Sequence, residues 1–337
     1  MVVDDIAALT GPGYVIDSVL HRPEPLVVRP TGPVDPDPDT AAAVAGVLRQ
    51  APTVTVVEGR PDHVPAVLAE AADVCLTDRP GAPRPWVTGG AVDVETAVAG
   101  QPLAAVALVS LLRSTVGAGV WEAVVAEAAT YGMVLGSAAH RAWLDQRGEA
   151  EVRPTTRPPV AVERRGDMLV IVLDRPEVRN AIDTTMRDAL VEALAVATAD
   201  PSVTGVSLAG AGPCFSAGGD LTEFGTVADG ATAFTVRLGC HPGLALHRVA
   251  DRVTAHVHGA CVGAGVEIPA FAGRVHAAPD TTFRLPELAM GLVPGAGGTV
   301  SIARRVGRQR LAWMALTGQP LDAPTALDWG LVDRIEG

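Results

Sequence analysis

Three glycine-rich turns in the second half of the chain constrain its fold more than any other feature. They lie at 210–220, 259–267 and 294–299 (PGAGGT), and the first two closely follow short apolar segments. Glycine lets the backbone adopt positive φ and approach a ligand closely. A turn that leads into a helix presents free N–H groups, and the helix dipole favours negative charge there. Two such turns that meet at one point would form an oxyanion hole for a carbonyl that becomes an enolate.

The segments around these turns predict alternating strands and helices. Short strands are expected at 168–173, 204–209, 253–257 and 274–277, and Asp183 can cap a helix that extends through Ala199. An apolar helix is expected after the second glycine-rich turn. Short strands followed by glycine-rich turns and helices are typical of an α/β domain.

The first half of the chain predicts a mixed region that ends in helices. Residues 1–40 are rich in Pro and Asp and predict a loop, and 78–90 hold a second cluster of breakers. A helix is expected at 40–50 and a strand at 53–58. Apolar residues recur at helical spacing in 103–113 and 120–135. The polar segment 148–159 contains three prolines and predicts a linker, with a boundary near 157 that divides the chain into 1–157 and 158–337.

Composition and charge exclude several classes of protein. The net charge is −12 and the 26 basic residues are all arginine, so neither nucleic acid nor an anionic membrane is an expected partner. No G-x-G-x-x-G follows the first strand and no G-K-[ST] occurs, which excludes dinucleotide and P-loop sites. The cysteines form no C-x-x-C pair and the histidines lack ligand spacing, so no metal site or disulfide framework is expected. The acidic N-terminus is unlike a signal peptide and no apolar run is long enough to cross a bilayer, so we expect a cytoplasmic protein.

Five segments in sequence order resemble the enoyl-CoA hydratase/isomerase (crotonase) family over about half the chain. They are DRPEVRNAID (174–183), CFSAGGDL (214–221), HGACVGAGVEI (258–268), FRLPELAMGLVPGAGGT (283–299) and LTGQPLDAPTALDWGLVDRI (316–335). Each alone is a weak signal, whereas the five in order are specific. The resemblance implies an α/β fold, a crotonase-like spiral of repeated ββα units for 158–337, and an acyl-CoA thioester as substrate.

The resemblance implies a catalytic role for five positions. The backbone N–H groups of Gly219 and Ala264 would bind the thioester oxygen, and Ala264 stands where the family usually has Gly. Glu267 and Glu287 match the two glutamates that hold and activate water in the hydratases. Gly295 falls at the turn that typically lies beside that water. Two carboxyls that share a buried site have their pKa values pushed apart, so one can donate a proton while the other accepts one.

Coenzyme A is expected as part of the substrate, with no separate cofactor and no metal. Arg179 and Ala217 are expected to contact it. The arginines at 304, 305, 308 and 310 are an alternative contact for its phosphates, and they are equally explained as solvated surface charges. Asp220 is expected to be a helix cap or a structural acceptor. His258 replaces the family's common Asn and is expected to be structural.

The chain departs from the family pattern at its two ends. It stops shortly after GLVDRI, where the family usually continues with a helical tail that supports trimers. Residues 95–147 resemble that tail, and 25–75 resemble a stripped core of strand, helix and strand. Our hypothesis is that 1–157 is a degenerate crotonase-like remnant whose helices dock on the complete core. The alternative is an unrelated regulatory or partner domain.

The sequence therefore predicts an enzyme that hydrates a 2-enoyl-CoA, or runs the reverse dehydration, with two glutamates and a backbone oxyanion hole. An alternative with the same fold is isomerisation of a double bond or another acyl-CoA reaction, and isomerisation needs only one well-placed base. An alternative of another class is a non-catalytic CoA-binding or scaffolding subunit. A homotrimer or hexamer is expected from the resemblance. The acyl chain is undefined, because 222–250 match the family pattern loosely.

Overall fold

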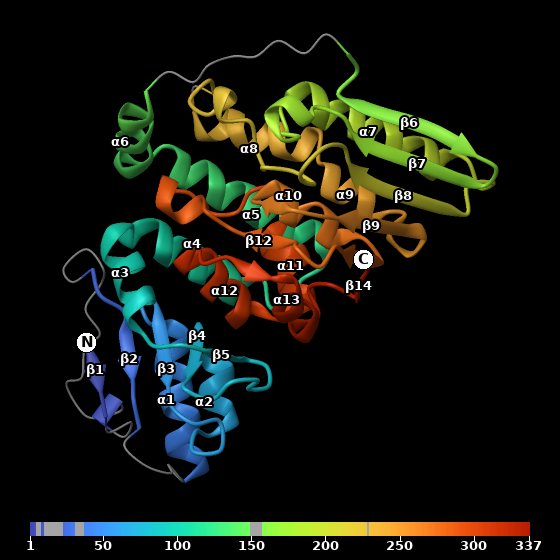
Figure 1. Cartoon of the computed structure of the whole chain (residues 1–337). Coiled ribbons are helices and arrows are strands. Elements are labelled where there is room, and N and C mark those ends of the chain that lie inside the picture. The colour runs from blue at the N-terminus through green and yellow to red at the C-terminus, as the bar shows by residue number, and fades with distance from the viewer. Residues whose placement is uncertain (5–7, 10–22, 31–36, 149–156, 228) are drawn as a thin grey trace.

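The computed structural model describes residues 1–337 except 5–7, 10–22, 31–36, 149–156 and 228. The described residues form an N-terminal sheet, a group of helices and a larger α/β core (Figure 1). The N-terminal sheet is parallel, in the order β1(Val2–Val3), β2(Leu26–Val28), β3(Thr55–Glu58), β4(Val74–Thr77), β5(Trp86–Thr88). Two helices, α1(Pro38–Gln50) and α2(Ala66–Ala71), belong to this unit.

The N-terminal sheet is buried on both faces, because alternate residues of each strand belong to two different apolar clusters. Leu26, Val57 and Cys75 pack with α1 and α2. Val27 and Val56 belong instead to the cluster that extends through the α/β core. The sheet is therefore a layer between its own helices and the rest of the molecule.

Four helices connect this sheet to the core: α3(Val92–Gly100), α4(Pro102–Ser114), α5(Val120–Leu135) and α6(Ala138–Arg147). No single helix in the described part of the chain is long and apolar enough to cross a membrane. Only α3 and α4 taken together are long and apolar enough among the described residues, and the two helices are bent by 112° relative to each other.

The core contains two sheets that the chain visits in turn. The larger one has the order β14(Arg334–Ile335), β11(Arg274–Ala277), β9(Val253–Val257), β8(Gly205–Gly210), β7(Met168–Leu173), β6(Val160–Arg165), and only β6 pairs antiparallel. The smaller one has the order β10(Ala260–Val262), β12(Thr282–Arg284), β13(Leu321–Asp322). The chain enters the larger sheet at β9, the smaller at β10, the larger again at β11 and the smaller at β12. The backbone therefore winds through the two sheets as a spiral.

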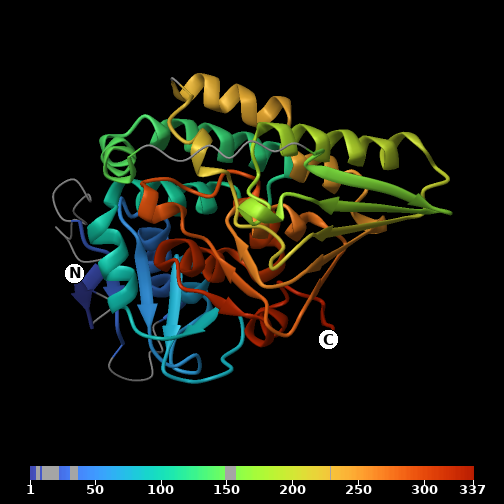
Figure 2. The same ribbon diagram turned by 45° about the horizontal axis from the view of Figure 1, so that its top comes forward.

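The core helices are α7(Thr184–Ala199), α8(Gly230–Gly239), α9(Pro242–His247), α10(Ala264–Glu267), α11(Gly298–Val306), α12(Arg308–Thr317) and α13(Ala323–Trp329). In Figure 2, α5, α7 and α8 form a layer along one side of the core, and the N-terminal sheet lies beside α12. The N-terminal helices dock on this core: α5 packs against α8 and α11, and α4 packs against α12. The contact that the remnant hypothesis requires is present, while the origin of residues 1–157 stays a prediction.

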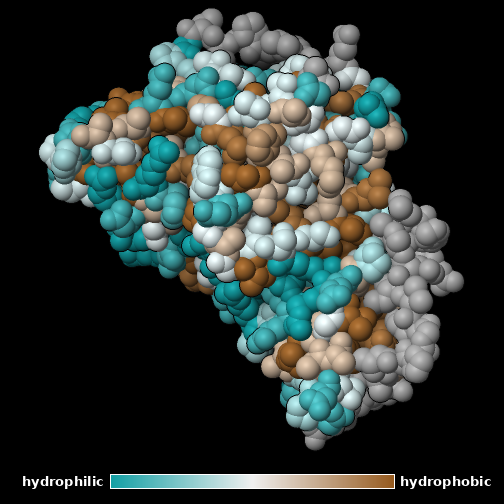
Figure 3. Space-filling model, turned by 180° about the vertical axis from the view of Figure 1, so that it is seen from behind, coloured by the Kyte–Doolittle hydropathy of each residue, from teal (hydrophilic) through white to brown (hydrophobic). Residues whose placement is uncertain are grey.

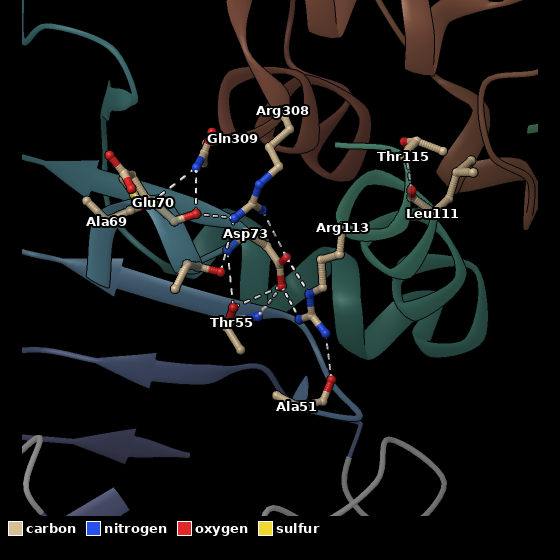
Figure 4. A network of polar contacts seen from close by, with 12 residues as sticks. Ala51, Thr55, Ala69, Glu70, Asp73, Leu111, Arg113, Thr115, Arg308 and Gln309 are labelled. Atoms are coloured by element: carbon tan, nitrogen blue, oxygen red, sulfur yellow. Dashed lines mark hydrogen bonds and ion pairs between the residues drawn. The ribbon is translucent and has the colours of Figure 1, made fainter. Parts of the chain in front are cut away.

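An ion-pair network fastens the N-terminal sheet to the core (Figure 4). Asp73, which is fully buried beside β4, accepts hydrogen bonds from Arg113 of α4, including one from Nε at 2.8 Å. Arg308 at the start of α12 contacts the oxygen that accepts from Arg113 Nε, with Nη1 3.5 Å from Oδ1. Thr55 donates its N–H and its hydroxyl to Asp73 at 2.9 Å each. One carboxylate thus joins the sheet, the docked helices and the core.

Most predicted elements are present, and the errors have local causes. The strands at 253–257 and 274–277 and the helix at 120–135 are confirmed at their predicted bounds. The prediction of a loop over 1–40 is wrong at β2, whose three buried residues lie between prolines at 25 and 30. The breaker cluster at 78–90 contains β5, and β6 was not predicted. The apolar helix after 263 is only four residues long, because Pro269 follows. Of the predicted linker, 149–156 lie outside the described residues.

Candidate active site

A cavity of about 240 Å³ lies where the glycine-rich turns meet the docked helix α5. All five predicted catalytic positions line it: Gly219, Ala264, Glu267, Glu287 and Gly295. Tyr131 and Leu135 of α5 line it too, as do Arg237 of α8 and residues of the segment 219–227. The N-terminal region therefore contributes directly to the wall of the cavity.

Two backbone N–H groups face this cavity without an acceptor. No hydrogen-bond acceptor among the described residues receives the N–H of Gly219 or of Ala264. Gly219 follows Gly218, whose positive φ of 91° turns the backbone. Ala264 begins α10 after Gly263, which adopts φ of 50°. Both turns thus keep a backbone donor unused among the described residues, and the methyl group of Ala264 does not remove its donor.

Glu287 approaches the second turn so closely that only glycine fits there. It begins a short 3-10 turn, Glu287–Met290, directly after Pro286. A Cβ atom at Gly263 would collide with Glu287 Oε1. Glu287 Oε2 is buried and has no hydrogen-bond partner among the described residues. The carboxyl group therefore faces the cavity with an oxygen free to exchange a proton with a bound molecule.

Glu267 is held by the third glycine-rich turn. Its Oε2 accepts the backbone N–H of Ala296 at 2.7 Å and of Gly298 at 2.8 Å. A Cβ atom at Gly298 would lie 2.6 Å from Glu267 Cγ, so the glycine permits this approach. The side chain is buried, with 2% of its surface exposed. Two N–H donors on one oxygen stabilise the ionised form of this carboxyl.

A third buried carboxyl, Glu127 of α5, binds the same turn from the other side. Its Oε1 accepts the N–H of Gly297 at 2.7 Å, and its Oε2 accepts the N–H of Thr299 at 2.9 Å and the hydroxyl of Thr299 at 2.6 Å. Residues 296 and 298 therefore donate to Glu267, while 297 and 299 donate to Glu127. The two carboxylates fix the turn between them.

Sequence reasoning missed Glu127, although a signal was available. The apolar face of the helix at 120–135 includes Val124, Ala128 and Tyr131, and Glu127 falls on that same face at helical spacing. A carboxyl on an apolar face is buried only when a specific partner satisfies it. The partner here is a turn 170 residues further along the chain, as the Gly297 contact shows, and the sequence alone does not indicate it.

Arg237 supplies positive charge beside the carboxyls. Its guanidinium carbon lies 3.4 Å from the centre of the Tyr131 ring, and its Nε donates to the carbonyl of Gly295 at 3.1 Å. A Cβ atom at Gly295 would collide with the Tyr131 ring. Gly295 is thus the point where α5, α8 and the third turn converge.

Burial raises the pKa of all three carboxyls. It raises the pKa of Glu127 to about 8, with the nearby charge of Glu267 as the second cause. The pKa of Glu287 is well above its ordinary value for the same two reasons. Burial also raises the pKa of Glu267, while the N–H groups of Ala296 and Gly298 and the charge of Arg237 lower it. Only its own backbone N–H acts on Glu287 in this way, so Glu287 holds a proton more firmly than Glu267 does.

The predicted coenzyme A contacts lie apart from the cavity lining. Arg179 is exposed in a left-handed conformation with φ of 57°, and its carbonyl accepts the N–H of Ala217 at 2.9 Å. Neither residue lines the cavity. Asp220 caps the short turn at 221–223, as predicted, and also contacts Arg175 at 3.3 Å. His258 contacts the carbonyl of Gly212 at 2.9 Å.

The arginine cluster at 304–310 serves the protein's own architecture. Arg305 pairs with Asp333 at 3.0 Å, and Arg310 donates to the carbonyl of Trp86 at 3.2 Å. Arg308 belongs to the Asp73 network, and Arg304 donates to the carbonyl of Ala118 at 3.3 Å. None of the four lines the catalytic cavity. Arg304 and Arg308 line a second cavity, of about 1090 Å³, so neither of the two predicted phosphate contacts is favoured over the other.

Comparison with known proteins identifies relatives for the second half of the chain. The profile of a family described as enoyl-CoA hydratase/isomerase matches residues 163–336. A mevalonyl-coenzyme A hydratase of Beauveria bassiana is 36% identical over 50% of this chain and 63% of its own length. A 2,3-dehydroadipyl-CoA hydratase of Escherichia coli is 34% identical over 52% of this chain and 68% of its own length. A mitochondrial enoyl-CoA hydratase of Pongo abelii is 32% identical over 52% of this chain and 61% of its own length.

Solved structures of similar proteins cover the same half. An enoyl-CoA hydratase from Mycobacterium smegmatis is 31% identical, with a TM-score of 0.49, over 53% of this chain and 70% of that chain. An enoyl-CoA hydratase subunit from Geobacillus kaustophilus is 28% identical, with a TM-score of 0.49, over 52% and 68% respectively. This chain thus spans between three fifths and seven tenths of the length of the relatives named here.

Proposed function

Because this chain belongs to the enoyl-CoA hydratase/isomerase family, we propose that it adds water to the C2–C3 double bond of a 2-enoyl-CoA, or catalyses the reverse dehydration. One observation carries the proposal. Two backbone N–H groups without acceptors and two buried carboxyls line the same small cavity. Hydration of a conjugated thioester needs both, because negative charge develops on the thioester oxygen while protons move at C2 and C3.

The N–H groups of Gly219 and Ala264 bind the thioester oxygen in this proposal. Water adds its oxygen to C3, and the electron pair of the double bond moves to the thioester oxygen as an enolate. A proton then reaches C2 and the enolate returns to a thioester. Fixed backbone donors stabilise the enolate without a titrating side chain.

The hydrogen bonds support different roles for the two glutamates in this proposal. Glu267, which two backbone N–H groups favour as an anion, takes the proton from water. Glu287, whose raised pKa keeps it protonated, delivers the proton to C2. The net reaction consumes one water and leaves both carboxyls in their starting states after one proton exchange with solvent.

Coenzyme A enters as part of the substrate, and we propose Arg179 and Ala217 as contacts for its portion outside the cavity. The small volume favours a short acyl group. Arg237 is a cation in the cavity wall, and the Escherichia coli relative is named for an acyl group that carries a carboxylate. A substrate series should therefore include a short 2-enoyl-CoA, a medium one and 2,3-dehydroadipyl-CoA.

The experiment follows the loss of the conjugated enoyl-thioester absorbance for the wild type, Glu267→Gln and Glu287→Gln. Each variant is expected to lose a factor of about 10²–10⁴ in kcat, because each removes a proton-transfer group. Glu192→Gln, an exposed glutamate of α7, is the matched control and should keep full activity. Wild-type activity that survives both substitutions would refute this mechanism. Double-bond migration without hydration would favour the isomerase alternative, and CoA binding without turnover would favour a non-catalytic subunit.

We also propose that residues 1–157 are a crotonase-like remnant whose helical segment 95–147 completes the catalytic core at 158–337. Support comes from Glu127 and Tyr131, which α5 contributes to the turn and to the cavity. The cytoplasmic location expected from the sequence stays a prediction.

Self-association as a homotrimer or hexamer is part of the same proposal. Large apolar side chains are exposed on and next to α5, with Trp121 at 53%, Met133 at 64% and Val116 at 68%. Figure 3 shows hydrophobic side chains gathered in the upper middle of one face of the molecule. Light scattering coupled to size-exclusion chromatography measures the mass directly, and a monomer at micromolar concentration would contradict this part of the proposal.

A further inference from the structure

Three side chains with metal-binding atoms meet on neighbouring strands of the larger sheet, away from the catalytic cavity. His256 of β9 lies directly opposite His276 of β11 in the parallel register. Glu336 follows β14, which pairs with β11, and its N–H donates to the carbonyl of Ala277 at 2.9 Å. Arg334 is the β14 residue opposite His276, and Glu336 follows it by two residues on the same face, so the three side chains lie together.

The donor atoms of these residues face one another. Nδ1 of His276 lies 3.2 Å from Glu336 Oε1, and Nδ1 of His256 lies 3.7 Å from Glu336 Oε2. Nδ1 of His276 is buried and has no hydrogen-bond partner among the described residues. A ring nitrogen can lie this close to a carboxylate oxygen only when a proton or a cation lies between them.

Positive charge on both rings is a poor way to satisfy this arrangement. The two rings lie 5.5 Å apart, so two protonated rings would repel each other. Arg334 is the other charged group close to the carboxylate, with Nε 3.4 Å from Glu336 Oε1, but its side chain is 69% exposed and can move into solvent.

We propose that His256, His276 and Glu336 bind a divalent zinc-like cation. Zinc bonds to His nitrogen and carboxylate oxygen at about 2.0–2.2 Å, so tetrahedral ligands lie roughly 3.3 Å from one another. The observed separations of 3.2 and 3.7 Å reach the two oxygens of one carboxylate. One donor atom of each residue lies within 4.8 Å of the other two, which suits this geometry with small adjustments. Water would complete the coordination.

This site would act on the structure rather than on the reaction. None of its three residues lines the catalytic cavity. The cation would tie β14, which is two residues long, to β9 and β11 through three ligands. Sequence spacing did not indicate this site, because two ligands come from separate strands and the third follows β14.

The test uses the full-length protein after removal of metals by dialysis against a chelator. Calorimetry with Zn²⁺ is expected to show one ion per chain. His276→Gln and Glu336→Gln are each expected to weaken that affinity by about tenfold or more, because each removes one of three protein ligands. His63→Gln is the matched control, since His63 also faces a single carboxylate, Asp62, at 3.9 Å, and it should bind Zn²⁺ as the wild type does.

Two further readouts separate this site from other metal-binding groups. Hydrogen exchange at 332–337 is expected to slow on addition of Zn²⁺ in the wild type and not in Glu336→Gln. The Co²⁺ form is expected to show visible d–d bands without thiolate charge-transfer absorption. The proposal would be overturned if Zn²⁺ does not bind stoichiometrically, or if both variants bind Zn²⁺ as tightly as the wild type does. Thiolate absorption in the Co²⁺ form would also overturn it.

Discussion

At the scale of single residues, the site depends on how buried carboxyls share one turn. Glu127 accepts the N–H groups of residues 297 and 299, which alternate along the turn with the N–H groups that donate to Glu267. Glu127 also raises the pKa of Glu287. In the proposed mechanism it would therefore act through Glu267 and Glu287, as a positioning residue.

Replacing Glu127 with Gln is expected to lower kcat by about tenfold, because the turn that holds Glu267 loses one of its two carboxylate partners. Removal of the charge also lowers the pKa of Glu287. The loss of activity at high pH, where Glu287 gives up its proton, should therefore move to lower pH. A pH profile of kcat measures both effects. Glu122→Gln, on the exposed face of the same helix, should leave the profile unchanged.

Gly263 gives a second prediction at this scale. Alanine there must adopt φ of 50° and must displace the carboxyl of Glu287. Gly263→Ala should cost about 1–3 kcal/mol in stability and nearly all activity. Gly81→Ala is a matched control, because Gly81 has φ of 66° and nothing lies within 4 Å of the added Cβ. Full activity in Gly263→Ala would show that Glu287 does not need its observed position.

At the scale of elements, the contact between α5 and α8 decides whether the cavity forms. Their backbones touch at Gly132 and Gly230, where a Cβ on Gly132 would lie 2.5 Å from the Gly230 carbonyl oxygen. The two helices carry Glu127, Tyr131 and Arg237, so a change in their separation alters one whole wall of the cavity.

Gly132→Ala is expected to force the helices apart, with a loss of about 1–3 kcal/mol in stability and a fall in kcat. Denaturant unfolding and the absorbance assay measure the two effects. Gly46→Ala in α1 is the control for a glycine-to-alanine change within a helix, since nothing lies within 4 Å of its added Cβ. It should raise stability by about 0.4–1 kcal/mol. Unchanged activity in Gly132→Ala would mean that α5 is not needed for catalysis.

At the scale of the whole molecule, one buried carboxylate joins the N-terminal unit to the core. Asp73→Asn leaves Arg113 and Arg308, which are 12% and 14% exposed, without their shared counter-charge. Removal of one partner of a buried ion pair costs about 3–5 kcal/mol. Chemical denaturation measures this loss, and Asp62→Asn, in an exposed cluster, should change stability by less than about 1 kcal/mol.

The pH dependence of stability also belongs to the whole molecule. A carboxyl whose pKa is higher in the folded than in the unfolded state contributes most at low pH, and the contribution is lost as pH rises through its folded pKa. For Glu127 that interval runs from its ordinary pKa of 4.5 to about 8. Stability should therefore fall between about pH 5 and pH 8, with a slope of at most about 1.4 kcal/mol per pH unit for each such group. The slope should be smaller in Glu127→Gln, and an equal slope would contradict the raised pKa.

The sequence by itself determined the local features of this protein. The alternation of short strands, glycine-rich turns and helices predicted the α/β class, and five ordered segments predicted the family. The predicted positions Gly219, Ala264, Glu267, Glu287 and Gly295 do line one cavity. These features are readable because each depends on residues close together in the chain, where a turn, a strand or a helix cap has its own pattern.

Only the tertiary structure decided what meets across long separations. Glu127 lies 170 residues before Gly297, the first turn residue that it binds, and Asp73 lies 235 residues before Arg308. The ligands of the proposed cation site come from two strands and from the residue that follows a third. A buried charge without a partner costs free energy, so each of these carboxylates must lie beside its own donors. The pairing then fixes how the parts of the fold pack together. That pairing is a property of the folded chain, and no local pattern records it.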